Sequence, residues 1–154
     1  LGFSITYRKN QPFPHTLHLV PKTVVLGIGC KRGTEAESIR ALIRETLEQN
    51  QIFKESICLI ASIDLKKDEE GIRICAEELG VPFVTWSAEE LEQVQSEDGF
   101  TESAFVRSVA GVGNVCERSA LKGAGTSRLL IRKTAHNGVT VAAAVKDYTV
   151  CMED

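Results

Sequence analysis

The sequence lacks the features that define several large classes of protein. No apolar run in its 154 residues approaches the roughly 18 residues that a membrane-spanning helix needs, and no secretory signal is visible. The formal net charge is -3 and the basic residues form no long stripe, which argues against nucleic-acid binding. Repeats, low-complexity tracts and heptads are also missing. We therefore expect neither a membrane nor a nucleic acid among its partners.

Cysteine is present, but its pattern excludes common cysteine chemistry. The five cysteines are odd in number, lie far apart and form no C-x-x-C pair: Cys30, Cys58, Cys75, Cys116 and Cys151. This spacing fits neither a disulfide framework nor a zinc site, and it is typical of a protein in a reducing compartment. We expect a cytoplasmic protein without a metal site of its own.

The composition is that of one globular domain with an extension. Hydrophobic residues make up 43% and charged residues 25% of the chain. Pro12 and Pro14 interrupt two extended segments, so residues 1–20 are expected to be a linker or the end of a preceding region. The chain begins with Leu1 and enters strand-like sequence at once, which indicates a piece of a longer polypeptide. Residues 21–150 are expected to form the domain.

Apolar strands and amphipathic helices alternate along the first two thirds of this domain. The expected strands are residues 23–28, 57–63 and 82–86, and a helix is expected after each. Such alternation predicts parallel strands joined by right-handed crossovers. Near the end, Asn137-Gly138 separates two further strands and predicts a hairpin. We expect an α/β fold of three layers: a mostly parallel sheet, helices on both faces, and a C-terminal antiparallel hairpin.

A glycine-rich stretch follows the first of these strands. Gly27, Gly29 and Gly33 are expected to let the backbone turn sharply and to let another group approach it. Thr34 is placed to cap the next helix, with Glu37 three residues on, in the pattern of a capping box.

The same stretch is predicted to receive an anion. Free amides at a helix start carry partial positive charge, and Lys31 and Arg32 add two full charges. The glycine spacing is G-x-G-x-x-x-G and no Lys-Ser/Thr pair follows it, so it fits neither a dinucleotide fold nor a Walker loop. A carboxylate or phosphate fits, and the alternative is a tight turn with solvated basic side chains.

Four segments together resemble one family, the C-terminal domain of the cobalamin-biosynthesis protein CbiG, whose stand-alone relative is CobE. The resemblance covers roughly residues 19 to 145. The segments are Leu19-Val20-Pro21-Lys22, Gly27-Ile28-Gly29-Cys30-Lys31-Arg32-Gly33-Thr34, Ala61-Ser62-Ile63-Asp64-Leu65-Lys66-Lys67-Asp68-Glu69 and Gly111-Val112-Gly113-Asn114-Val115-Cys116-Glu117.

This resemblance implies part of a hydrolase that acts on cobalt-precorrin-5A. It opens the ring A lactone and releases acetaldehyde to give cobalt-precorrin-5B; the cobalt belongs to the substrate, and no other cofactor is implied. The partners implied are a cobalt-corrinoid intermediate, an N-terminal region of the same chain and other enzymes of the pathway. One alternative is a non-catalytic corrinoid-binding or assembly module, and a weaker one is a domain that binds an unrelated phosphorylated metabolite.

The predicted site is the edge of the sheet where loops 29–34, 62–68 and 111–117 should converge, because ligands of open α/β sheets bind at the carboxyl ends of strands. The predicted substrate-binding residues are Gly27, Gly29, Cys30, Lys31, Arg32, Gly33, Thr34, Ser62, Lys66, Gly111 and Gly113.

Two carboxylates and one thiol are candidates for the chemistry itself. Asp64 or Glu117 is the candidate general base, although Asp64 also fits a turn residue and Glu117 a first-turn acid that favours its helix dipole. Cys30 is a candidate nucleophile if nearby positive charge lowers its pKa. The other interpretation is a small residue that fills the turn.

Overall fold

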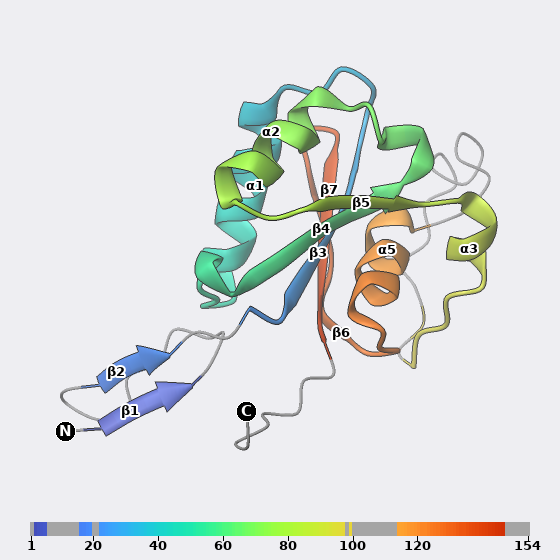
Figure 1. Ribbon diagram of the computed structural model, residues 1–154. Helices are drawn as coiled ribbons and strands as arrows, with labels where there is room; N and C mark the ends of the chain where they lie inside the picture. Colours follow the sequence, from blue (N-terminus) through green and yellow to red (C-terminus); the bar gives the residue numbers. More distant parts are fainter. Residues whose placement is uncertain (1, 6–15, 20–21, 98, 100–113, 147–154) are drawn as a thin grey trace.

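The fold is built on one five-stranded sheet. The computed structural model describes residues 2–5, 16–19, 22–97, 99 and 114–146, and within them the strand order is β5-β4-β3-β7-β6 (Figure 1). The first three strands in this order are parallel, β7 is antiparallel to β3, and β6 is antiparallel to β7. The bounds are β3 Val24–Cys30, β4 Ile57–Ile63, β5 Phe83–Trp86, β6 Leu129–His136 and β7 Val139–Val145. A separate parallel pair joins β1 (Gly2–Ile5) to β2 (Thr16–Leu19).

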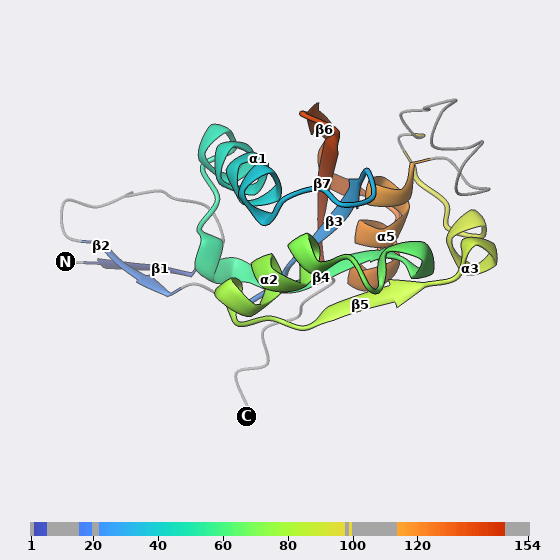
Figure 2. The ribbon, with the colours of Figure 1, turned by 90° about the horizontal axis from the view of Figure 1, so that it is seen from above.

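Helices cover both faces of this sheet and complete the three layers that the sequence predicted. Helices α1 and α2 lie on one face and α5 on the other, with α3 beside α5 (Figures 1 and 2). Their bounds are α1 Ala36–Gln49, α2 Glu70–Leu79, α3 Ala88–Glu92 and α5 Val115–Ala124, with short 3-10 turns η1 Lys54–Ser56 and η2 Asp64–Lys66. Among the described residues, no helix is both long and apolar enough to cross a membrane.

The central strand β3 supplies side chains to both halves of the core. Leu26 and Ile28 pack on the α1 and α2 side, whereas Val25 packs on the α5 side. This alternation is the period-two geometry of a strand covered on both faces. On α1, Ile39, Leu42, Ile43 and Leu47 are buried as their spacing predicted.

Local turn chemistry also follows the sequence. Gly80 ends α2 in the left-handed conformation with φ of 70°. Ser87 caps α3, because its Oγ accepts the Glu90 N–H at 3.2 Å. Asn137 and Gly138 have φ of 50° and 78° and form the turn between β6 and β7.

For the glycines of the first motif, the predicted close approach of another group is confirmed, but the predicted turn lies further along the chain. Strand β3 continues through Gly27 and Gly29 to Cys30, so neither glycine is in the turn, and only Gly33 has a positive φ, of 78°. A Cβ on Gly27 would lie 1.8 Å from the Cys116 carbonyl oxygen, so this glycine gives α5 room to lie on β3. A Cβ on Gly29 would lie 2.7 Å from Thr140 Oγ1.

The predicted capping box of α1 does not form. The N-cap residue of α1 is Glu35, and its side chain makes no cap hydrogen bond. Thr34 lies one residue before the N-cap position and does not cap the helix. The Thr34 hydroxyl instead donates to the Lys31 carbonyl at 2.5 Å and closes the turn on itself.

The two ends of the domain meet at the amino end of β3. The Lys146 N–H, just after β7, donates to the Thr23 carbonyl at 2.8 Å, and the Thr23 N–H donates to the Ser56 carbonyl at 3.0 Å. The chain therefore enters and leaves the domain at one place.

The close contact at Gly27 predicts that Gly27→Ala destabilises the domain by about 3 kcal/mol or more, because backbone of α5 must move to admit the methyl group. Urea unfolding followed by the fluorescence of Trp86, the single tryptophan, measures this loss. Gly80→Ala is the control: its Cβ meets open space, and only its positive φ should cost about 1–2 kcal/mol. Equal losses in the two variants would contradict the close packing of α5.

Candidate functional site

Two of the three predicted loops come together at the carboxyl ends of β3 and β4. The Gly33 N–H in the loop after β3 donates to Glu69 Oε1, in the segment after β4, at 2.6 Å. The Lys31 N–H donates to the Gly138 carbonyl of the hairpin turn at 3.1 Å. We call the surface formed by residues 31–35, 64–69 and 137–138 the carboxyl-end surface.

The start of α5 lies at the same edge of the sheet. Val115, its first residue, packs with Ile63, the last residue of β4, and with Leu91 of α3. The third predicted loop therefore leads to this edge, although Gly111 and Gly113 themselves lie outside the described residues.

The carboxyl-end surface carries charges of both signs. Its basic residues are Lys31, Arg32, Lys66 and Lys67, and its acidic residues are Glu35, Asp64, Asp68 and Glu69. Within the part of the chain that the structure describes, none of the four basic side chains makes an ion pair. These cations are therefore available to carboxylates of a ligand.

Leu65 is a residue of this surface that no sequence pattern predicted. Its side chain is 64% exposed, and among the described residues no other large hydrophobic side chain is exposed. It lies in η2 between Asp64 and Lys66. The sequence did carry a signal, because an apolar residue among the charged residues of 64–69 is unusual. The exposure of its side chain depends on the conformation of the turn, which the sequence does not show.

Several predicted binding residues use their polar groups or their space inside the fold. The Ser62 hydroxyl is buried and donates to the Ile28 carbonyl at 2.6 Å, which ties β4 to β3. The space beside Gly27 is filled by α5, and the Gly29 carbonyl accepts from the Thr140 hydroxyl at 3.3 Å. Binding roles for these three residues stay predictions, and packing already accounts for their identity.

The two candidate bases lie in different surroundings. Asp64 is exposed directly after β4, whereas Glu117 is fully buried and its Oε2 accepts the Lys133 N–H of β6 at 2.9 Å. Strands β4 and β6 are three positions apart in the sheet, roughly 14 Å at the usual strand spacing. Because Glu117 is buried and its carboxylate is used inside the fold, Asp64 is the candidate base that is open to solvent.

Cys30 does not have the environment of an activated thiol. It is half-buried at the end of β3, and burial raises its pKa above the ordinary value, although the charge of Lys66 and a hydrogen bond with Thr34 act in the other direction. A raised pKa means less thiolate at neutral pH. The structure thus favours the small residue that fills the turn over the nucleophile.

Asn114 is a second residue that the sequence reading did not single out. It is the N-cap of α5, is 2% exposed, and has a φ of 58° that few residues other than glycine and asparagine adopt. Neither atom of its side-chain amide has a hydrogen-bond partner in the described structure. A buried amide without hydrogen bonds costs about 1–3 kcal/mol, so Asn114 lowers the free energy of unfolding. Packing does not explain why an asparagine stands there.

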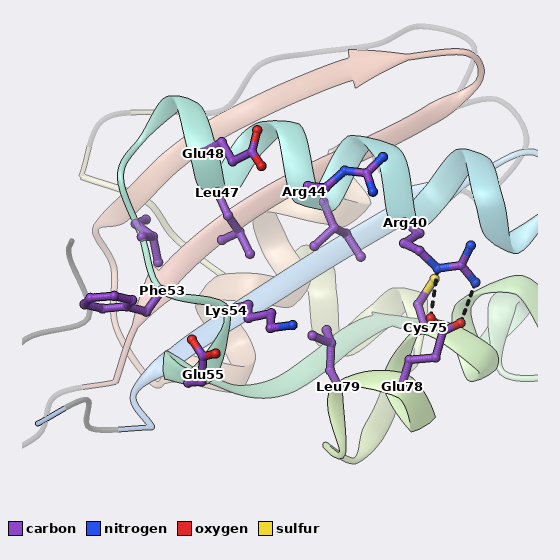
Figure 3. Close-up of a pocket in the computed structure, with 12 residues that line it drawn as sticks. Arg40, Arg44, Leu47, Glu48, Phe53, Lys54, Glu55, Cys75, Glu78 and Leu79 are labelled. Atoms are coloured by element: carbon purple, nitrogen blue, oxygen red, sulfur yellow. Dashed lines mark hydrogen bonds and ion pairs between the residues drawn. The ribbon is translucent and has the colours of Figure 1, made fainter. Parts of the chain in front are cut away.

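A groove between α1 and α2 is an independent hollow, away from every predicted site residue. It encloses about 580 Å³, and apolar residues such as Leu47, Phe53 and Leu79 line it (Figure 3). Arg44, Lys54, Glu48 and Glu55 stand around it (Figure 3).

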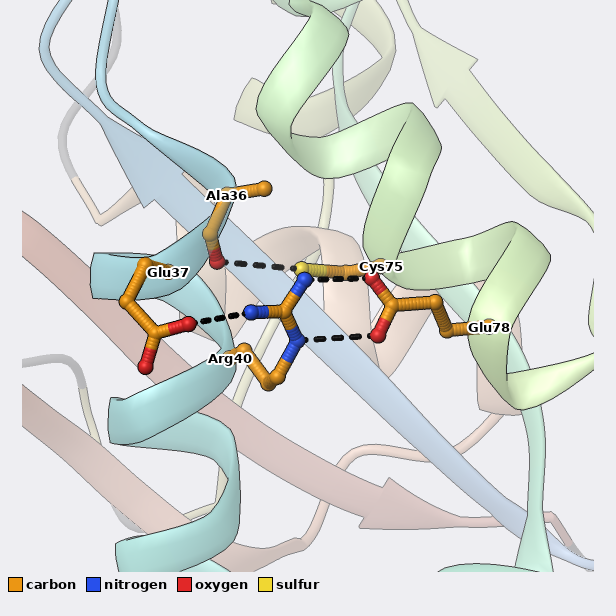
Figure 4. Close-up of polar contacts among 5 residues, drawn as sticks. All are labelled: Ala36, Glu37, Arg40, Cys75 and Glu78. Carbon is orange, nitrogen blue, oxygen red and sulfur yellow. Dashed lines mark hydrogen bonds and ion pairs between the residues drawn. The ribbon is translucent and has the colours of Figure 1, made fainter.

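Arg40 closes this groove at one side by joining the two helices. Its guanidinium pairs with Glu37 of α1 and with both carboxylate oxygens of Glu78 of α2 (Figure 4). The Cys75 thiol donates to the Ala36 carbonyl beside it at 3.5 Å. These contacts satisfy Arg40 internally, which leaves Arg44 and Lys54 as the cations available to a ligand of the groove.

The raised pKa predicts how Cys30 reacts with iodoacetamide. At pH 7 the folded protein should alkylate at Cys30 more slowly than the denatured protein, and the rate should rise as pH passes above 9, because only the thiolate reacts. Mass spectrometry of the peptide that contains Cys30 measures the rate. Lys66→Ala removes the charge that lowers this pKa and should slow the reaction further. Faster alkylation of the folded protein than of the denatured protein at pH 7 would support Cys30 as a nucleophile.

Comparison with known proteins agrees with this architecture. The family model described as "Cobalamin synthesis G C-terminus" matches residues 24–144. The chain is 38% identical to the cobalt-precorrin-5A hydrolase of Salmonella typhimurium over 134 residues, which are 87% of this chain and 37% of that one. It is 34% identical to the hydrolase of the same name from Priestia megaterium over 128 residues, 83% of this chain and 33% of that one. The chain thus spans about a third of the length of these relatives.

A solved structure matches more of its own length. The crystal structure of CobE, described as a protein from the cobalamin (vitamin B12) biosynthetic pathway, aligns with a TM-score of 0.73 and 32% identity. The alignment covers 81% of this chain and 91% of that one. Since the family model covers well over half of the sequence, the chain belongs to the family of cobalamin synthesis G C-terminal domains.

Proposed function

We propose that this domain holds the cobalt-corrin substrate of cobalt-precorrin-5A hydrolysis by its peripheral carboxylates. The substrate is a planar macrocycle edged with acetate and propionate groups. The observation that carries the proposal is the set of four basic side chains without ion pairs on the carboxyl-end surface, in a family that includes cobalt-precorrin-5A hydrolases. Charge-assisted hydrogen bonds to carboxylates are among the stronger contacts available to a protein.

The exposed Leu65 supports the same ligand. A corrin presents a broad apolar face inside its ring of carboxylates, and the exposed Leu65 precedes Lys66 and Lys67 in the same loop. Burial of one leucine side chain under a ligand contributes about 1.5–3 kcal/mol. A ligand with charges at its edge and an apolar centre therefore suits this surface better than a small phosphate.

The reaction proposed for the complete enzyme opens the ring A lactone and expels a two-carbon unit. Water adds to the lactone carbonyl and the acyl–oxygen bond breaks; carbon–carbon cleavage then releases acetaldehyde, and the macrocycle takes the electron pair. Asp64 is the proposed base for the water, because its carboxylate is exposed on the carboxyl-end surface. Cobalt-precorrin-5B is the proposed product.

A non-catalytic corrinoid-binding module is the second candidate. The observation that favours it is that the chain covers only about a third of the relatives named as hydrolases, so the catalytic residues can lie in the rest of those proteins. Anaerobic incubation of the 154-residue chain with cobalt-precorrin-5A separates the two. Acetaldehyde that disappears in Asp64→Asn supports catalysis within this domain, and binding without acetaldehyde supports the module.

The carboxylate clamp predicts a selective loss of affinity. Lys31→Ala/Arg32→Ala should weaken binding of cobyrinic acid, a corrin with free carboxylates, about tenfold or more, and should change binding of cobinamide, whose side chains are amides, less than twofold. Titration followed by the visible spectrum of the corrin measures both. The matched control is Arg44→Ala/Lys54→Ala, which removes one lysine and one arginine at the groove. A loss in the control alone would move the site to the groove.

The apolar contact predicts a loss of affinity that does not distinguish between the two corrins. Leu65→Ser should weaken cobyrinic acid and cobinamide alike, several-fold for each, because both share the macrocycle. The same titration measures this change, and the exposed position leaves the unfolding free energy within about 0.5 kcal/mol of the wild type. Unchanged affinity for both corrins would remove Leu65 from the site.

A further inference from the structure

One amide of the carboxyl-end surface already holds a carboxylate from the protein itself. Gly33 N donates to Glu69 Oε1 at 2.6 Å across 36 positions of sequence. This is a short contact for a backbone amide, and its acceptor is a carboxylate, which makes stronger hydrogen bonds than a neutral oxygen does. The loop that the sequence predicted to receive an anion therefore receives one within the folded chain.

Glu69 is placed for this contact by the packing of its helix. It is the N-cap of α2, but its side chain makes no cap bond to that helix. The first turn of α2 sits directly against the other loop, since a Cβ on Gly71 would lie 2.6 Å from the Thr34 carbonyl oxygen. The helix start thus fixes Glu69 beside Gly33 while leaving the carboxylate to bond outside its own helix.

Space and charge around Gly33 suit a carboxylate from outside equally well. Gly33 is exposed, and a Cβ built on it meets no atom within 4 Å, so the space beside its Cα is open to solvent. Lys66 and Glu69 both lie near enough to Cys30 to act on its thiol electrostatically. The Lys66 ammonium and the Glu69 carboxylate therefore lie in the same part of the carboxyl-end surface. A second carboxylate cannot sit at the Gly33 amide while Glu69 occupies it, because like charges repel at such a distance.

We propose that the Gly33 amide is a carboxylate subsite, and that Glu69 fills it until a carboxylate of the ligand takes its place. The proposal rests on the proposed function for the ligand, a corrin that carries free carboxylates. Glu69 then determines specificity, because a ligand must compete with it for the Gly33 amide. A ligand competes well when its other carboxylates bind Lys31, Arg32 or Lys66 at the same time. A small monocarboxylate has no such help and displaces Glu69 poorly.

The size of the effect follows from competition for one amide. If Glu69 occupies the amide in about nine molecules of ten, the apparent affinity for an external carboxylate falls about tenfold. Glu69→Ala removes both the occupant and its charge, so cobyrinic acid should bind about tenfold more tightly. Glu69→Gln removes the charge but keeps an acceptor, so it should give a smaller gain. Glu70→Ala removes a neighbouring exposed carboxylate and should change the affinity less than twofold.

The first experiment is titration of cobyrinic acid into the wild type and these three variants, with thermal unfolding to check the fold. Tighter binding in Glu69→Ala and Glu69→Gln, but not in Glu70→Ala, supports the subsite. Weaker binding in Glu69→Ala that Glu69→Gln restores overturns it, because Glu69 would then be a tie that holds the loop in its binding shape. Equal affinities in all four proteins also overturn it.

A second experiment does not depend on the corrin. The amide resonance of Gly33 is followed by NMR while sodium propionate is added at constant ionic strength. We expect this resonance to move at lower propionate concentrations in Glu69→Ala than in the wild type. That result without cobyrinic acid binding would leave the subsite standing and refute the corrin as its ligand. A Gly33 resonance that does not respond in Glu69→Ala refutes the subsite itself.

Discussion

Helix α5 can lie on the central strand only because residue 27 has no side chain. The Cys116 carbonyl occupies the space where a Cβ would stand, so the helix backbone comes closer to β3 than any other residue would permit. The rest of that half of the molecule follows from this approach. Val25 and Ala144 pack against Ala120 and Leu121, and the start of α5 reaches the carboxyl end of β4, where Val115 meets Ile63. A strand buried on both faces, with a helix held this tightly, gives the loops at its carboxyl end a firm base.

Most of the fold could be predicted because its signals are local. The spacing of Ile39, Leu42 and Ile43 indicated a helix with one buried face, and Asn137-Gly138 indicated a hairpin from two residues. The glycines of β3 were placed in a turn because the groups that lie against them, Cys116 at Gly27 and Thr140 at Gly29, are far along the chain. A glycine that makes room for a helix and a glycine that bends the backbone look the same in sequence. Thr34 likewise satisfied the capping pattern, but the helix begins one residue too late to use it.

The candidate site shows the same division between local and distant information. Lys31, Arg32 and Lys66 were evident as charges beside predicted strand ends, and the parallel sheet brings their loops together. Three features that modify this site depend on tertiary contacts and left no sequence signal of their own. The Ser62 hydroxyl is used by the Ile28 carbonyl, Glu117 is turned inward to β6, and Glu69 reaches Gly33 from another loop. Charge is visible in a sequence, whereas the partner that already neutralises or occupies it is not.

The hydrogen bond between Lys146 and Thr23 has a consequence for how this domain can be shared among genes. The chain enters and leaves at the amino end of the sheet, on the side opposite the carboxyl-end surface. Additional polypeptide can therefore be joined before or after the domain, or removed, without a break in a strand of the five-stranded sheet. Such a domain behaves as a module that recombination can move intact. This property suits a family in which one member consists almost entirely of the domain, while in others it makes up about a third of the chain.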